Sequence, residues 1–177
     1  MSRTTGSDPL ARWARRAAAL VSIGLLIATP ACGKTGDRLA GAAAKTAECA
    51  PLTADGVPQA RVCSPSAGES VGATETVRGL VGGIGGQQLW LVVLAINDRQ
   101  HPQRQVSPAT DGTFAGLAHF GDSQGGAGQE FTLQVVAADS SAAQTFRRYL
   151  DAKTNVGIAA LPDGATVLTS VTVTRSK

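Results

Sequence analysis

The stretch QLWLVVLAI, residues 88–96, decides the fold of this chain. Both of its alternating sets of side chains are apolar, one running from Leu89 to Ala95 and the other from Trp90 to Ile96. A strand with one buried face alternates apolar and polar residues, so a strand that is apolar on both faces is covered on both. The sequence therefore predicts a central strand here, with packed structure on each side of it.

Shorter β-like segments surround this strand. They alternate in polarity, carry β-branched residues and are separated by Gly, Pro, Asn and Asp turn residues. The predicted strands are 61–64, 74–81, 88–96, 104–107, 113–120, 130–137 and 165–174. Segments 104–107 and 113–120 are expected to form a hairpin through the Asp111-Gly112 turn. About seven short strands with a buried tryptophan in a middle strand indicate an all-β, immunoglobulin-like sandwich.

One helix is predicted to interrupt the β pattern, from Ser141 to Asp151. Ser141 and Gln144 fit a capping box, in which each side chain bonds the other residue's backbone N–H. The apolar side chains of this segment share one stripe: Ala142, Ala143, Phe146, Tyr149 and Leu150. The helix is therefore expected to lie against a sheet, which accounts for the second covered face of the central strand.

The N-terminus has the layout of a bacterial lipoprotein export signal. Basic residues ending at Arg16 precede an apolar run from Ala17 to Ala28, and small residues then lead to Cys32. Such a signal is cleaved before the cysteine, which becomes an acylated N-terminus. We expect residues 1–31 to be a lipoprotein signal peptide. We expect Cys32 to carry palmitate-type acyl chains that anchor the protein on the extracytoplasmic face of the cell membrane.

Two alternatives to this anchoring stay open. Thr29 stands where the lipobox pattern of lipoproteins has an aliphatic residue, which leaves ordinary secretion with cleavage after Ala31. An uncleaved anchor is the other alternative, although the apolar run is shorter than the roughly 20 residues that span a bilayer.

The cysteine count agrees with export and acylation. Acylation of Cys32 removes one of three cysteines and leaves Cys49 and Cys63 to pair in an oxidising compartment. Closing a loop of that length stabilises a fold by about 3 kcal/mol in the chain-entropy model. No metal site is expected, because a CxxC pair is absent and His101 and His119 have no companions at ligand spacing.

Composition divides the exported part into two regions. Residues 32–60 are rich in Ala, Gly and Thr without apolar periodicity, so they are expected to form a flexible tether. Residues 61–177 are expected to form one domain. Residues 1–31 hold four basic and one acidic of the 16 basic and 13 acidic side chains, which leaves 12 of each. This neutral balance lacks the basic surface of a nucleic-acid-binding protein.

The motifs of the predicted domain resemble those of bacterial immunoglobulin-like domains. The opening segments Ser64–Val71 and Val77–Gly79 are similar to domains associated with spore-germination proteins. Four later segments resemble a variant of these domains that is attached to actinobacterial exported and effector proteins. They are Leu89–Val93, His101–Gln103, Asp111–Phe114 and Glu130-Phe131. The resemblance covers roughly residues 61–150. It implies a fold and an accessory role, since these domains have no common ligand.

Motifs for catalysis and cofactor binding are weak. Residues 68–72 match the G-x-S-x-G of serine hydrolases, but they fall in a turn between short predicted strands. The glycine clusters match neither the phosphate-loop nor the dinucleotide-binding order. Asp111, Asp122 and Glu130 do not have the spacing of an EF-hand calcium loop. We therefore expect no enzymatic activity, no cofactor and no metal.

Two function classes remain. The first is a membrane-tethered, non-catalytic scaffold or protein-binding module that contacts another envelope protein through exposed strands and loops around residues 101–105 and 121–128. Its candidate contact residues are His101, Pro102, Gln103, Asp122 and Gln124. The second is a small-ligand-binding protein or minor hydrolase with a pocket under the helix, lined by Trp90, Phe146 and Tyr149. We favour the first, because a domain of this size needs those aromatic side chains for its core.

Overall fold

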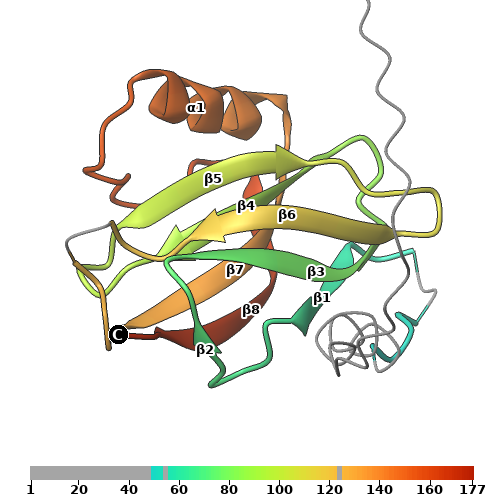
Figure 1. The fold of residues 1–177 in the computed structure, drawn as a ribbon. Helices are drawn as coiled ribbons and strands as arrows, with labels where there is room; N and C mark the ends of the chain where they lie inside the picture. The colour runs from blue at the N-terminus through green and yellow to red at the C-terminus, as the bar shows by residue number, and fades with distance from the viewer. Residues whose placement is uncertain (1–48, 54–55, 123–124) are drawn as a thin grey trace, which may run out of the picture. The chain divides into compact units, whose positions relative to one another are not determined.

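The computed structural model describes residues 49–53, 56–122 and 125–177. The expected signal segment, Cys32, the tether up to residue 48 and Gln124 lie outside these residues. The described part is a two-layer β-sandwich with one α-helix that lies beside β5 (Figure 1). The mainly β architecture expected from the sequence is confirmed.

Two sheets form the layers. The smaller sheet has the order β1 (Gln59–Ser64), β3 (Thr74–Gly82) and β6 (Thr113–His119). The larger sheet has the order β2 (Ser70–Val71), β8 (Ala165–Arg175), β7 (Glu130–Ala138), β4 (Gln88–Leu94) and β5 (Gln100–Val106). Every ladder is antiparallel except the short parallel pairing of β2 with β8. The helix α1 (Ser140–Asp151) connects β7 to the segment that leads into β8.

The doubly apolar strand is covered on both faces, as predicted, but it ends at Leu94, and Ile96, which was expected to belong to it, is 72% exposed. β4 lies between β7 and β5. Leu89, Leu91 and Val93 point into the core between the two sheets, where all three are buried. Trp90 and Val92 point to the opposite face, beneath α1. Strict alternation along one strand therefore builds two separate hydrophobic clusters.

The hairpin expected from segments 104–107 and 113–120 is wrong. β5 pairs with β4, whereas β6 pairs with β3 in the other sheet. The Asp111-Gly112 turn instead lies against β3, where the Val81 backbone N–H donates to the Gly112 carbonyl at 2.9 Å. Val106 and Phe114 are both buried in the inter-sheet core but arrive there from opposite layers. The chain therefore crosses between sheets at this turn, and the true hairpin joins β4 to β5.

The expected capping box at Ser141 and Gln144 is also wrong. α1 begins at Ser140, and the Asp139 carboxylate caps it by accepting from the Ser141 and Ala142 backbone N–H groups, each at 2.9 Å. A carboxylate at this position also complements the positive end of the helix dipole. The Asp139 N–H donates to the Gly164 carbonyl at 3.0 Å, so a contact distant in sequence fixes the cap.

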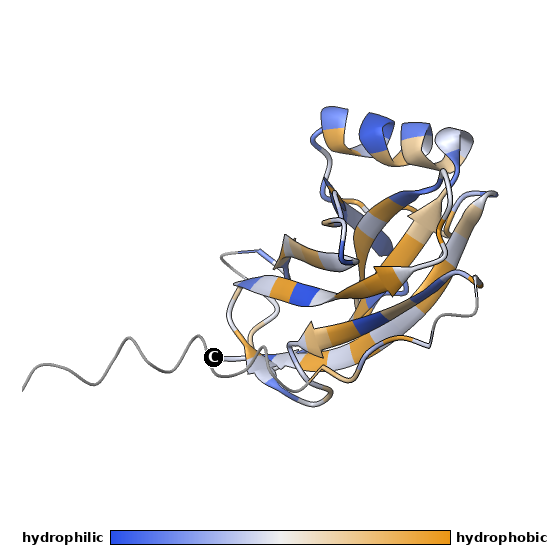
Figure 2. Ribbon diagram, turned by 90° about the vertical axis from the view of Figure 1, so that its right-hand side faces the viewer, coloured by the Kyte–Doolittle hydropathy of each residue, from blue (hydrophilic) through white to orange (hydrophobic). Residues whose placement is uncertain are grey.

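α1 covers one end of the outer face of the larger sheet. Its residues Ala142, Ala143 and Phe146 are buried, and the rings of Phe146 and Trp90 pack with centroids 5.2 Å apart. The hydrophilic residues of α1 colour the side of its ribbon that faces away from the sheet (Figure 2). Arg147 fixes the helix to the sheet, because its guanidinium donates to Gln88 Oε1 at 2.5 Å.

The predicted disulfide is present between Cys49 and Cys63. It joins the segment before β1 to that strand. The Arg61 guanidinium donates to the Ala50 carbonyl at 3.0 Å, and the Gln59 side chain donates to the Thr53 carbonyl. The segment 49–53 is therefore held along β1 by side chains as well as by the disulfide.

Candidate functional site

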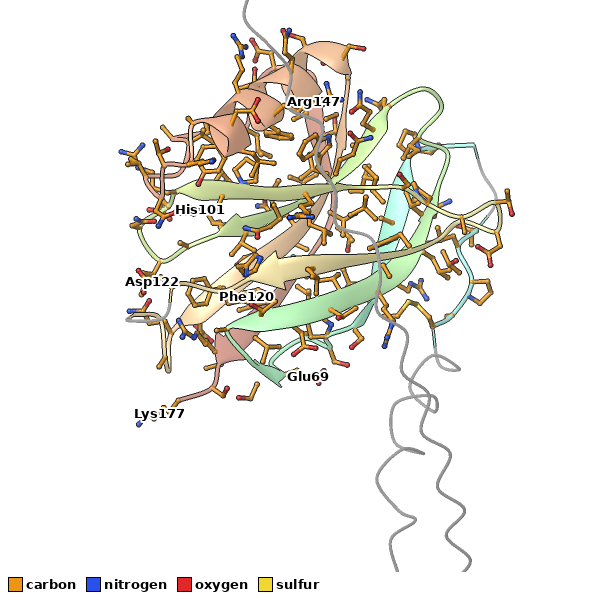
Figure 3. The ribbon with its side chains drawn as sticks, turned by 45° about the horizontal axis from the view of Figure 1, so that its top comes forward. Glu69, His101, Phe120, Asp122, Arg147 and Lys177 are labelled. Carbon is orange, nitrogen blue, oxygen red and sulfur yellow. A yellow bond between two sulfur atoms is a disulfide. The ribbon has the colours of Figure 1, made fainter. Side chains whose placement is uncertain are left out.

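A cleft of about 580 Å³ opens at the corner of the sandwich where β5, β6 and the end of α1 meet. β4 and β7 supply its floor, including the buried side chains of Val93 and Phe131. The loop that follows β6 and the loop that follows α1 form its rim. In Figure 3 the labelled His101 and Asp122 lie on the same side of the domain, at this corner.

The cleft brings together most of the residues nominated as contacts. His101, Pro102, Gln103 and Asp122 all line it, and Gln124 lies outside the described residues. The first three were proposed as contact loops. They lie instead in the edge strand β5, where Pro102 is buried. Of the four candidates that the structure describes, Asp122 is the one outside a strand, in the loop after β6. His119 also lines the cleft, although no local sequence pattern places it with the others.

Gln103 links the two sheets at this corner. Its Oε1 accepts from the His119 backbone N–H at 3.1 Å, and its Nε2 donates to the His101 carbonyl at 2.9 Å. One backbone N–H of β6 is thereby bonded by a side chain from β5, although the two strands form no ladder. One amide side chain thus holds the two histidine-bearing strands at a fixed separation.

His101 is held by the end of the helix. Its Nδ1 lies 3.1 Å from Tyr149 Oη, with the rings nearly perpendicular at 79°. Partial burial lowers the pKa of His101. Burial also raises the pKa of the Tyr149 phenol, and a backbone hydrogen bond from Gly157 partly offsets this. The cleft wall is therefore a neutral imidazole and a neutral phenol at neutral pH.

Gly157 closes the other side of the His101 ring. Its φ is +70°, and a Cβ there would fall 2.9 Å from His101 Nε2 and 2.7 Å from the Arg99 Cβ. Any larger residue would push the ring away and would also be strained in the left-handed region. The backbone of the loop after α1 is thus part of the wall that orients His101.

His119 forms the wall on the β6 side. Its Nδ1 lies 3.0 Å from Thr74 Oγ1 on the neighbouring strand β3, directly opposite in the ladder. The side chain is exposed, in contrast to the half-buried His101. The two histidines therefore occupy different environments although they line the same cleft.

A distant arginine shapes the loop that carries Asp122. Arg175, near the end of β8, is buried and donates to the carbonyls of Asp122, at 2.6 Å, and Gly125. The Asp122 carboxylate accepts from the Gly125 N–H at 2.6 Å. A Cβ on Gly121 would fall 2.8 Å from the Arg175 Nη1. This contact across 53 positions of sequence was not foreseeable from the loop itself.

Lys153 stands at the rim in an unfavourable backbone conformation. It follows the last turn of α1 with φ of +51°, and its N–H donates to the Leu150 carbonyl at 3.2 Å. Glycine is the usual residue at such a helix end, and a larger side chain there costs about 1 kcal/mol. The chain therefore places an exposed lysine on the cleft at a cost in stability.

The aromatic side chains expected to line a pocket under the helix do not do so together. Trp90 and Phe146 are almost completely buried and pack against each other, and neither lines the cleft. Tyr149 alone reaches the cleft. Trp90 and Phe146 thus belong to the core. The Trp90 Nε1 is buried with no hydrogen-bond partner among the described residues.

The remaining chemical motifs have ordinary structural positions. Ser70 of the G-x-S-x-G motif lies in β2, and the chain continues into β3 rather than into a helix, so the motif is not a nucleophile elbow. Within residues 49–53, 56–122 and 125–177, no three His, Cys, Asp or Glu side chains are grouped to hold a metal ion. The described part also contains no helix of the length and hydropathy needed to span a bilayer.

Comparison with known proteins gives no match: no protein-family model, no curated protein and no solved structure matches this chain.

Proposed function

We propose that this chain is a lipid-anchored, non-catalytic module of the cell envelope that binds another envelope protein through the cleft between β5, β6 and α1. The observation that carries the proposal is the convergence of His101, Gln103 and Asp122 on one cleft, from a strand and a loop separated in sequence. The Cys49–Cys63 disulfide supports an oxidising location. The export-type N-terminus supports the anchor.

The shape of the cleft suits a protein partner. Protein interfaces combine an apolar centre with a polar rim. Here the buried apolar side chains of Val93 and Phe131 and the charged side chains of Lys153 and Asp122 all line the cleft. Leu150 adds an exposed apolar side chain beside them. A partner that inserts an apolar side chain and hydrogen-bonds around it would use all of these groups.

The strand order supports an immunoglobulin-like fold, which forms part of the proposal. β5–β4–β7–β8 follows the C′–C–F–G order of such domains, and β1–β3–β6 follows A–B–E. Two features differ from antibody domains. Trp90 lies on the C-equivalent strand but packs beneath α1 rather than between the sheets. The disulfide joins the N-terminal segment to β1 instead of linking the two sheets.

Site-specific photo-crosslinking in native membranes tests the binding surface. A photoreactive residue at Lys153 or Leu150, on the cleft, is expected to capture one envelope protein. The matched control places the same residue at Arg78, which is exposed on β3 and does not line the cleft. Gln103→Ala should weaken capture at Lys153 because it loosens the corner that Gln103 holds. Equal capture from Lys153 and Arg78 would contradict the proposal.

The intact mass of the mature protein tests the anchor. A chain that begins at Cys32 and carries added acyl mass is the expected result, with loss of membrane partitioning in Cys32→Ala. A chain that begins at Cys32 without acyl mass would replace the anchor by secretion. A chain that retains residues 1–31 would instead show an uncleaved anchor.

A further inference from the structure

His101 is a titratable side chain set into the wall of the cleft. It lies on β5 opposite Val93 of β4, which belongs to the floor, and its ring is half-buried. Partial burial already lowers the pKa of the ring below its ordinary value of 6.5. Burial disfavours the charged form, so the ring holds a proton less tightly whenever less water reaches it. The proton affinity of His101 therefore depends on what occupies the cleft.

Both nitrogen atoms of the His101 ring lie against other parts of the protein. Nδ1 is 3.1 Å from Tyr149 Oη. On the other side, the Gly157 backbone approaches so closely that a Cβ there would fall 2.9 Å from Nε2. A backbone hydrogen bond also joins Gly157 to Tyr149, so the ring, the phenol and the loop after α1 form one connected group. A partner side chain can therefore cover the ring, but it has little room to form an ion pair with either nitrogen.

Besides Tyr149, charged and titratable side chains surround the ring from several elements. Lys153 follows α1, Asp122 lies in the loop after β6, and His119 lies on β6. Arg99 precedes β5 and lies beside the loop after α1. These groups include charges of both signs, and the cause of the lowered pKa is burial rather than a neighbouring charge. Removal of water is therefore the event to which the ring responds.

We infer that a partner which fills the cleft expels the proton of His101, so that the cleft holds its partner at neutral pH and releases it in acid. The inference rests on the proposed function, because it concerns the same cleft. Covering the ring removes the water that stabilises its charged form, so the complex binds the proton less tightly than the free protein does. Because linkage is reciprocal, protonation of the ring weakens the binding of the partner.

The pH range of this effect follows from the direction of the two shifts. The affinity for the partner is complete above the pKa of His101 in the free protein, which lies below 6.5. As the pH decreases from this value toward the still lower pKa in the complex, the affinity falls by at most about tenfold for each pH unit. Below the pKa in the complex the affinity is constant again. The loss is therefore expected at mildly acidic pH.

Photo-capture from a photoreactive residue at Leu150, measured in native membranes from about pH 7.5 to about pH 5, tests the inference. We expect the yield of crosslinked product to fall by roughly fivefold or more over this range. In His101→Gln the ratio of the two yields should approach one, because an amide does not acquire a proton. Thr154→Asn, a change of a cleft residue without a titratable side chain, is the matched control and should keep the ratio of the unsubstituted chain.

A second measurement follows the ring itself. The Cε1–H resonance of His101 in the full chain, assigned by its loss in His101→Gln, reports the pKa in the free protein. The same resonance in the purified photo-crosslinked product reports the pKa when the cleft is occupied. We expect the titration to move to lower pH in the crosslinked product. A move to higher pH would mean that the partner brings an anion to the ring, and it would overturn the inference.

The outcomes separate this inference from the proposed function. Capture that decreases in acid in the unsubstituted chain and in Thr154→Asn, but not in His101→Gln, supports the inference. The same pH dependence in all three proteins overturns it and leaves the proposed function standing, as does capture that increases in acid. Failure to capture a partner at any pH overturns both. If His101→Gln does not fold, the comparison between the unsubstituted chain and its crosslinked product decides the question.

Discussion

The inter-sheet core and the cluster beneath α1 share β4 but depend on different structure. Leu91 is completely buried between two sheets whose ladders join residues far apart in sequence. Trp90, the preceding residue, is buried beneath one helix and the segment that contributes Ile158 and Leu161. The first cluster defines the sandwich. The second positions the end of α1, and therefore Tyr149 and Lys153 at the cleft.

The largest effect is expected from a substitution that disrupts the cluster beneath α1. Trp90→Ala removes the side chain against which Phe146 packs and should lower the free energy of unfolding by about 3–5 kcal/mol. Amide exchange in α1 should rise more than exchange in β3. The control Trp90→Phe keeps most of the apolar volume and removes the unpartnered Nε1, so its cost should stay below about 1.5 kcal/mol. Uniform exchange across α1 and β3 would show that the clusters are not separable.

The matched change on the other face of β4 should act on the whole domain. Leu91→Ala leaves a cavity between the sheets. It should lower the free energy of unfolding, measured in urea, by about 2–5 kcal/mol. Amide exchange in β3, β7 and α1 should increase together, because the helix cannot remain packed once the sheet beneath it opens. A loss of protection confined to α1 would reverse the roles assigned to the two clusters.

A smaller change sharpens the comparison at the start of the helix. Asp139→Ala removes the acceptor of two backbone N–H groups and should cost about 1 kcal/mol. Ser141→Ala is the control, because the Ser141 side chain does not cap the helix, and it should change the unfolding midpoint little. If Ser141→Ala lowered the free energy of unfolding more than Asp139→Ala, the helix would be capped by Ser141, as the sequence predicted.

At the other end of the helix, Lys153→Gly should stabilise the fold slightly. Glycine adopts the left-handed conformation without the cost that lysine incurs, so thermal unfolding should indicate a gain of up to about 1 kcal/mol. Photo-capture from Leu150 should decrease in the same variant if the ammonium contacts the partner. If stability increases and capture from Leu150 is unchanged, Lys153 does not contact the partner.

The smallest expected effect concerns pH. The folded-state pKa of His101 lies below its ordinary value of 6.5, because burial disfavours the charged ring. The unfolded chain therefore binds the proton more readily. The contribution of His101 to stability is complete above the unfolded pKa and is lost as the pH falls through the folded pKa.

The charged and titratable groups around this ring are Arg99, Asp122, Lys153, His119 and Tyr149. Urea unfolding from about pH 8 to about pH 5 should show this loss, and His101→Asn should reduce it. Thr154→Asn, which changes a cleft residue without a titratable side chain, is the control. If the free energy of unfolding fell more steeply with decreasing pH in His101→Asn than in the unsubstituted chain, His101 would not be the source of the pH dependence.

Predictions that depended on local pattern were confirmed where burial alone decided the outcome. The apolar residues 89–93 could be satisfied only by cover on both faces, and the structure provides a sheet on one side and a helix on the other. The stripe that includes Phe146 indicated which side of α1 is buried. Cys49 and Cys63 paired as the cysteine count suggested.

The predictions of strand pairing at the Asp111-Gly112 turn and of the helix cap were wrong, because in each case distant contacts selected the outcome. The Asp111-Gly112 turn fits a hairpin and a crossing between sheets equally well, and the packing of Val106 and Phe114 from opposite layers selected the crossing. The capping box was predicted at Ser141, but the helix is capped by Asp139, two residues earlier. The bond from Asp139 to Gly164 selected the carboxylate.

The sequence by itself determined the mainly β composition, the doubly covered strand, the buried side of the helix and the disulfide, because each follows from residues close in sequence or from a count. Only the tertiary structure decided the sheet assignment of β5, the meeting of His101 with Tyr149 and the shaping of the Asp122 loop by Arg175. These contacts join positions 48 and 53 residues apart. Periodicity and turn chemistry act over a few residues, so they cannot specify which distant groups will face each other across a cleft.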